Sequence, residues 1–197
     1  WKALPDYLEG SEESFMPLVD TSGSMNVPVS GSTTAMHIAV SLGMYLAERN
    51  RSVFKDEFIT FSTKPRFQKI TGTTLRNRYN GICRADWDMS TNLGSALDLI
   101  LDTAVAHDLP QEDLPTKLLV LSDMQFNPGR GGENAMQMAR RKYTEAGYQV
   151  PGIVWWNLAD RGNNLPITVN STDTAVVSGF SPSIMTSLLN GKLTPMS

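Results

Sequence analysis

The segment Asp20-Thr21-Ser22-Gly23-Ser24 places one carboxylate and two hydroxyls at alternating positions of the chain. This spacing allows one loop to direct several oxygen atoms toward a single point. Hard divalent cations such as Mg²⁺ prefer an octahedral set of oxygen ligands and keep some water, so a few Asp, Ser and Thr side chains suffice to hold one. The first chemistry that the sequence indicates is therefore the binding of a divalent cation.

Two further oxygen donors stand at the ends of other predicted elements. Thr91 lies just before a predicted helix, and Asp123 follows the most apolar predicted strand. Because ligands of open α/β sheets gather at the carboxyl ends of the strands, we expect both residues on the same rim as Asp20. The predicted metal ligands are Asp20, Ser22, Ser24, Thr91 and Asp123.

A simpler interpretation of the same residues is structural. Asp20 and Ser22 would cap the following turn and Asp123 would begin a loop, as Asx and Ser turns commonly do. The placement of all these residues at loop tips on one predicted rim favours the metal site.

The elements that would hold these residues alternate between strand and helix. Short apolar runs predict buried strands, and apolar residues spaced three and four apart predict amphipathic helices. Strands are predicted at residues 15–19, 57–61, 67–70, 117–121, 150–156, 167–169 and 174–177, and helices at 34–46, 73–79, 92–107, 133–146 and 181–191.

This alternation predicts an α/β fold: a doubly wound, mainly parallel sheet with helices on both faces and a Rossmann-like architecture. The strands at 57–61 and 67–70 flank a turn that contains Pro65, so they predict one antiparallel edge strand. We expect an N-terminal arm over residues 1–14, a single domain over 15–191 and a tail over 192–197.

The pattern of oxygen donors resembles that of the von Willebrand factor A (vWA) domain, whose metal-ion-dependent adhesion site reads Asp-x-Ser-x-Ser, then Thr, then Asp. More narrowly, the chain is similar to the A domain of the Ro (TROVE) ribonucleoprotein and to its uncharacterised relatives in plants, phages and large viruses. The segments that carry this narrower similarity are Leu121-Ser122-Asp123-Met124-Gln125-Phe126, Arg140-Arg141-Lys142-Tyr143, Trp156-Asn157 and Ser178-Gly179-Phe180. The helical-repeat region that binds RNA in the Ro family has no counterpart in this sequence.

The resemblance implies a metal-dependent, adhesion-type protein-binding module rather than an enzyme. Ser22, Ser24 and Thr91 would supply neutral oxygens, and Asp20 and Asp123 negative charge, to Mg²⁺, with Mn²⁺ or Ca²⁺ as alternatives. An open coordination position would take an Asp or Glu of a partner protein, or of another domain of the parent chain. The adjoining loops give a predicted ligand rim of Asn26, Asn92, Gln125, Phe126 and Arg130.

The competing interpretation is a metal-assisted hydrolase of phosphate esters with Asp20 as its nucleophile. Phosphatases of that type typically have a second Asp two positions later as general acid. Here that position is Ser22, whose hydroxyl titrates far too high to donate a proton at neutral pH.

Composition limits the partners. The net charge is −3, from 17 basic and 20 acidic residues, which argues against direct nucleic-acid binding through broad electrostatics. Cys83 stands alone, so neither an internal disulfide nor a thiolate zinc site is expected. The sequence starts without an apolar leader and has no run long enough to cross a bilayer. We therefore expect an intracellular, cytoplasmic domain of a larger protein, without membrane contact.

Overall fold

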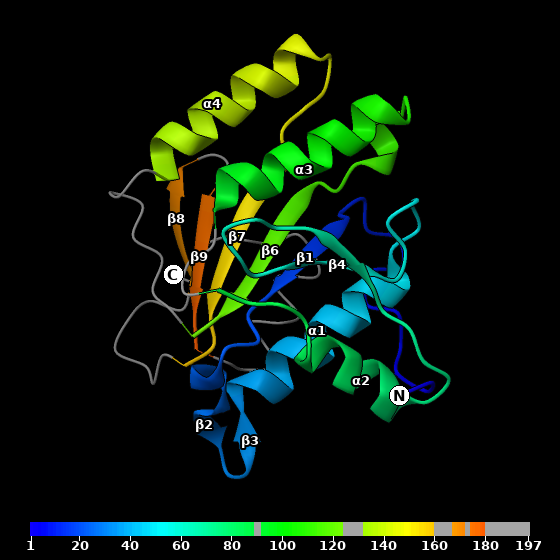
Figure 1. Cartoon of the computed structure of the whole chain (residues 1–197), viewed down its shortest axis with the longest axis vertical. Helices are drawn as coiled ribbons and strands as arrows, with labels where there is room; N and C mark the ends of the chain where they lie inside the picture. The colour runs from blue at the N-terminus through cyan, green and yellow to red at the C-terminus, as the bar shows by residue number, and fades with distance from the viewer. Residues whose placement is uncertain (89–91, 124–131, 160–166, 172–173, 180–197) are drawn as a thin grey trace.

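The computed structural model describes residues 1–88, 92–123, 132–159, 167–171 and 174–179 (Figure 1). Its strands are β1 (Phe15–Val19), β2 (Pro28–Ser30), β3 (Thr33–Thr34), β4 (Glu57–Thr60), β5 (Phe67–Lys69), β6 (Lys117–Ser122), β7 (Gly152–Asn157), β8 (Ile167–Ser171) and β9 (Thr174–Ser178). Its α-helices are α1 (Ala35–Arg49), α2 (Leu75–Cys83), α3 (Leu93–Ala106) and α4 (Gly132–Glu145), with 3-10 turns η1 (Gly23–Asn26) and η2 (Gln111–Asp113). The helix predicted at 181–191 lies outside the described residues.

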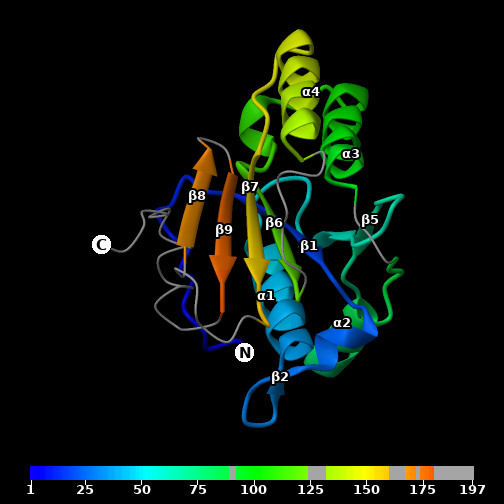
Figure 2. The same cartoon turned by 90° about the vertical axis from the view of Figure 1, so that its left-hand side faces the viewer.

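The main sheet has seven strands in the order β5-β4-β1-β6-β7-β9-β8. The five inner strands pair in parallel, and β5 pairs antiparallel with β4. The predicted fold class and the predicted antiparallel edge are therefore confirmed. The structure adds a second antiparallel edge, since β8 runs opposite to its neighbour β9 (Figure 2). Only two residues separate β8 from β9, too few for the crossover that a parallel pair requires.

Helices cover both faces of the sheet (Figure 1). Alternate residues of β6 point into different cores: Leu119 and Leu121 join the cluster beneath α1 and α2, whereas Leu118 and Val120 join the cluster beneath α3 and α4. Strand side chains alternate in direction, so a strand covered on both faces reads as a continuous apolar run. No helix in the described part of the chain is long and apolar enough to cross a membrane.

Helix α1 lies very close to β1, the strand that leads to Asp20. A Cβ atom added to Gly43 would come within 2.7 Å of Val19 Cγ2, which is closer than real contacts allow. Thr34 caps the helix by accepting a hydrogen bond from the His37 backbone N–H at 3.2 Å. Glycine at position 43 therefore permits the close approach of α1 to the strand below the predicted site.

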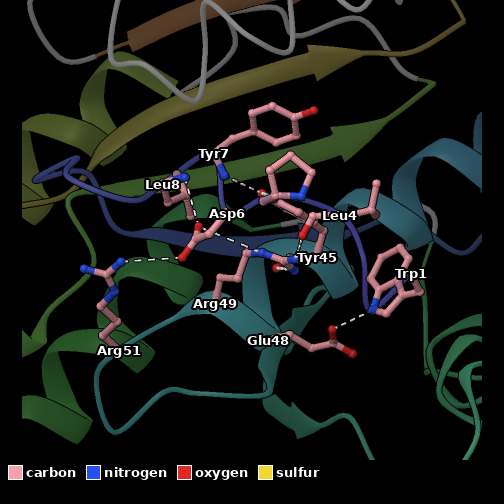
Figure 3. A network of polar contacts seen from close by, with 10 residues as sticks. Trp1, Leu4, Asp6, Tyr7, Leu8, Tyr45, Glu48, Arg49 and Arg51 are labelled. Carbon is pink, nitrogen blue, oxygen red and sulfur yellow. Dashed lines mark hydrogen bonds and ion pairs between the residues drawn. The ribbon is translucent and has the colours of Figure 1, made fainter.

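The N-terminal residues lie along the C-terminal half of α1 (Figure 3). The Tyr45 hydroxyl accepts a hydrogen bond from the Tyr7 backbone N–H at 2.8 Å and donates one to the Pro5 carbonyl at 2.8 Å. The Arg49 guanidinium stacks 3.8 Å from the centre of the Tyr45 ring, and the Trp1 indole donates to Glu48 at 2.7 Å. These contacts fasten the start of the chain to α1.

Tyr143 joins α4 to α3 and gives a prediction on alkaline unfolding. The side chain is fully buried, and its hydroxyl donates to the Leu97 carbonyl at 2.7 Å. Burial, followed by the charges of Asp98 and Asp102, raises the pKa of Tyr143 above its ordinary value of 10.0. Above about pH 10 the unfolded chain releases this proton while the folded chain retains it, so the free energy of unfolding falls by about 1.4 kcal/mol per pH unit.

Urea unfolding between about pH 9 and pH 11 would measure this loss. In the Tyr143→Phe variant, the free energy of unfolding should fall less steeply with pH, because unfolding releases about one proton fewer. Tyr148→Phe, which removes a hydroxyl that donates to the Leu109 carbonyl at 2.8 Å, serves as the matched control. Equal slopes in the intact chain and in Tyr143→Phe would contradict the prediction.

Candidate metal centre

Four predicted ligands, Asp20, Ser22, Ser24 and Asp123, follow the carboxyl ends of β1 and β6. These strands are parallel neighbours, with Val19 opposite Leu121. Asp20 follows β1 and Asp123 follows β6, so the two carboxylates leave the sheet at the same rim. Asp20 and Asp123 are 103 positions apart in the sequence, and the parallel pairing of β1 and β6 places both at one rim.

Asp20 is almost fully buried, with 1% of its surface exposed. Its Oδ1 atom accepts the Ser22 backbone N–H at 2.9 Å, and its Oδ2 atom accepts the Ser122 hydroxyl at 2.7 Å. Its own backbone N–H donates to the Leu121 carbonyl at 2.9 Å. The carboxylate is therefore held in one orientation, behind the hydroxyls of the following loop.

The Ser22 and Ser24 hydroxyls face each other, with 2.9 Å between the two Oγ atoms. Ser22 occupies the N-cap position of η1, yet its side chain makes no capping hydrogen bond. Met25, in the same turn, is fully buried and anchors the loop to the core. The Asx turn of the simpler interpretation is present at Asp20, but the Ser22 hydroxyl is not used as a helix cap.

Asp123 carries an unsatisfied buried oxygen. Its Oδ1 atom is buried and has no hydrogen-bond partner in the part of the chain that the structure describes. A buried carboxylate oxygen without a partner costs free energy, and native structures normally satisfy such atoms with a donor, a water or an ion. Among the described residues, this atom is therefore open to a donor, a water or an ion at the rim.

The donor set also fits a hard cation. Asp20, Ser22, Ser24 and Asp123 offer oxygen atoms alone, which suit Mg²⁺ or Ca²⁺ better than softer metals. Across the described ranges, no cluster of three or more His, Cys, Asp and Glu residues could hold a metal. A centre built from these described residues would therefore have to take hydroxyl oxygens as well as carboxylates.

The remaining predicted residues divide into two groups. Asn26 donates to the Gly23 carbonyl at 3.2 Å, and Asn92 caps α3 by accepting the Ser95 backbone N–H at 3.0 Å. Both amides thus have a local structural role. The other predicted residues, Thr91, Gln125, Phe126 and Arg130, lie outside the described residues.

Sequence reasoning missed a layer of buried polar residues at the strand ends. Thr60 ends β4, Ser122 ends β6 and Asn157 ends β7, and each has at most 4% of its surface exposed. Thr21, after β1, is also buried and donates to the Ala85 carbonyl at 3.1 Å. The sequence signal for this layer is a polar residue at the last position of an apolar strand. Ser122 shows what such a residue can do, because its hydroxyl orients Asp20.

The segment after Asp20 was predicted as a loop, but the structure shows regular elements in it. It contains η1 and the hairpin of β2 and β3, which projects beside the N-terminal end of α1 (Figure 1). Gly31 turns the hairpin with a φ of +55°, a conformation that favours glycine. The hairpin has an irregular register, and each strand is very short, so it leaves little trace in the hydrophobic pattern.

Comparisons with known proteins give a family and a fold. The family described as "Domain of unknown function (DUF7788)" matches residues 14–195. An uncharacterised protein of Acanthamoeba polyphaga mimivirus, L728, is 33% identical over 192 residues, which are 95% of this chain and 32% of the relative. The chain thus spans about a third of that curated relative.

Two solved structures share the fold at low sequence identity. The Ro (RSR) protein of Deinococcus radiodurans aligns with a TM-score of 0.57 and 17% identity, over 92% of this chain and 35% of that protein. Proximal thread matrix protein 1 of the mussel byssus aligns with a TM-score of 0.50 and 14% identity, over 92% and 46%. The architecture is the vWA-like, Rossmann-like one that the sequence predicted.

Proposed function

Since this chain belongs to the DUF7788 family and has a vWA-like fold, we propose that it is a metal-dependent protein-binding module. In this proposal an acidic side chain of a partner protein binds at a divalent cation held at the carboxyl ends of β1 and β6. The observation that carries the proposal is the buried Oδ1 atom of Asp123, which has no hydrogen-bond partner among the residues that the structure describes, on the same rim as the facing hydroxyls of Ser22 and Ser24.

The site residues would have different roles in binding the cation. Ser22, Ser24 and Asp123 would hold the cation, together with Thr91 if the ligand pattern of vWA domains applies to this chain. Asp20 would add negative charge from behind, since its two oxygens already accept hydrogen bonds from Ser22 and Ser122. When bound, the cation supplies positive charge and an open coordination position for a carboxylate.

The geometry favours binding over hydrolysis. A nucleophilic aspartate must present an oxygen to its substrate, whereas Asp20 is 1% exposed and both of its oxygens are engaged. The Ser22 hydroxyl stands where a phosphatase would need a general acid. We therefore propose a module that binds a partner carrying Asp or Glu and performs no catalysis itself.

We extend the proposal to the cation and the parent protein. Mg²⁺ is the proposed cation, with Mn²⁺ and Ca²⁺ as the alternatives that the same oxygen ligands accept. The module would be one domain of a larger, TROVE-like cytoplasmic protein. The length of the mimivirus relative and of the Ro protein supports this, because the chain aligns with only about a third of each.

Thermal unfolding of the intact chain tests the cation. At a roughly hundredfold excess over Kd, Mg²⁺ or Mn²⁺ should stabilise the fold by about 2.7 kcal/mol, which raises Tm by about 5–10 °C for a domain of this size. A pull-down in which partners are lost on adding a chelator would then test the binding role. Unchanged unfolding with either cation would contradict the proposal, and phosphate-ester turnover lost in Asp20→Asn would favour the hydrolase instead.

Ser122 gives a further test, because its hydroxyl donates to Asp20 and Ser122 is not itself a proposed ligand. The Ser122→Ala variant removes the 2.7 Å hydrogen bond to Asp20 Oδ2 and leaves every proposed ligand in place. We expect a loss of cation affinity of about tenfold to hundredfold, the usual cost of removing a hydrogen-bond partner that lies behind the ligands of a metal. Calorimetric titration with Mn²⁺ measures it, and Ser122→Thr, which keeps a hydroxyl, should recover part of the affinity.

A further inference from the structure

An exposed tryptophan lies on the same side of the molecule as the candidate centre. Trp87 has 46% of its surface exposed, whereas Trp155 and Trp156 are 5% and 0% exposed. An indole left in water forgoes a large gain from burial, and tryptophan is enriched among the residues that dominate protein interfaces. Trp87 is therefore a candidate contact residue for a partner.

The segment that carries Trp87 crosses the carboxyl ends of β1 and β4. The Ala85 carbonyl accepts the Thr21 hydroxyl at 3.1 Å, and Thr21 directly follows Asp20. The Asp88 backbone N–H donates to the Phe61 carbonyl at 3.0 Å, and Phe61 directly follows β4. Trp87 is thus placed on the rim that holds Asp20.

The backbone around Trp87 is held on both sides. The Asp86 carboxylate forms an ion pair with Arg66, and the Asp88 Oδ2 atom accepts the Thr63 hydroxyl at 2.7 Å. Both partners belong to the turn between β4 and β5. A side chain presented from a fixed backbone loses little conformational entropy when a partner covers it.

The two flanking carboxylates also select what can cover the indole. A second acidic side chain of a partner would gain nothing here, because Asp88 is negative and the charge of Arg66 is already paired with Asp86, whereas an aliphatic or aromatic side chain would bury the ring. By contrast, residues 21–36, in the loop and hairpin that begin at the site, carry no charged side chain. An acidic partner residue would meet no further negative charge from that segment.

We propose that Trp87 is the apolar anchor of the binding surface, and that the partner is a protein segment with an aliphatic or aromatic residue at a fixed spacing from its acidic residue. This inference rests on the proposed function, because the acidic residue is placed by the cation. A cation and a carboxylate alone would accept any exposed acid, so the contact with Trp87 supplies the selectivity among acidic partners.

Selection of a displayed library of random peptides on the intact chain in Mg²⁺ tests this inference. Peptides released by a chelator should share an acidic residue and an apolar residue at constant separation. Trp87→Ala should bind the selected peptides at least about tenfold more weakly, while the residual binding stays sensitive to the chelator. Val105→Ala is the matched control, since Val105 is 56% exposed on α3 and should leave binding unchanged.

The outcomes separate this inference from the function on which it rests. Chelator-sensitive peptides with an acidic residue alone, bound equally by Trp87→Ala, would overturn the role of Trp87 and leave the proposed function standing. Peptides whose binding needs Trp87 but resists the chelator would show that Trp87 and the cation do not belong to one binding surface, which would overturn the inference. Absence of any chelator-sensitive peptide would contradict the proposed function and this inference with it.

Discussion

Replacing Asp123 by alanine is expected to lower the affinity for Mn²⁺ by more than about a hundredfold, the upper range found for residues that only orient a ligand. The buried Oδ1 atom of Asp123 has no partner among the described residues, so it is the atom with the most to gain from a cation. Calorimetric titration of the intact chain and of Asp123→Ala with Mn²⁺ measures the loss. Glu112→Ala, which removes an exposed carboxylate on η2, is the control and should bind as the intact chain does.

The same variant should change stability in opposite directions with and without the cation. In chelator, Asp123→Ala should unfold at the same temperature as the intact chain or higher, because it removes a carboxylate whose buried Oδ1 atom has no hydrogen-bond partner among the described residues. With Mn²⁺ the order should reverse, since only the intact chain gains from binding. A variant that is less stable in chelator would instead show that Asp123 is a structural residue of its loop.

The sequence predicted the frame of the fold because that frame follows from hydrophobic patterning. Apolar runs located β1 and β6 to within a residue, and the three-and-four spacing located the start of α1, which continues to Arg49, beyond the predicted end at residue 46. Helix α2 runs from Leu75 to Cys83, whereas the prediction was 73–79. The polar residues of this amphipathic helix explain the difference: only Ile82 in it is buried, so the apolar pattern gives little information on where it ends.

The placement of Asp20 and Asp123 on one rim could be predicted from the sequence, whereas the contacts around them could not. Asp20 and Asp123 could be placed on one rim because each follows a strand of a parallel sheet. The hydrogen bond from Ser122 to Asp20 depends on the register between β1 and β6, which no local pattern specifies. The exposure of Trp87 was equally hidden, because an isolated tryptophan between two aspartates has no periodicity that assigns it to core or surface.

Trp156 is the residue whose loss should cost the most stability. Its side chain is fully buried in the cluster beneath α1, and its Nε1–H donates to the Gly179 carbonyl at 2.6 Å. Alanine at this position would leave a large cavity and remove that donor, so the free energy of unfolding should fall by about 3–5 kcal/mol. Urea unfolding measures the change. Trp156→Phe keeps most of the volume and should cost only about 1–3 kcal/mol.

The phenylalanine variant also shows how far the site depends on β7. Trp156 lies opposite Leu121 in the register of β6 and β7, one position before Asn157 and Ser122. The proposed ligands of the described chain follow β1 and β6, and none belongs to β7. Trp156→Phe should therefore bind Mn²⁺ as tightly as the intact chain, despite its lower stability. A parallel loss of affinity would mean that the end of β7 helps to hold Ser122 in place, and that the centre extends over three strands rather than two.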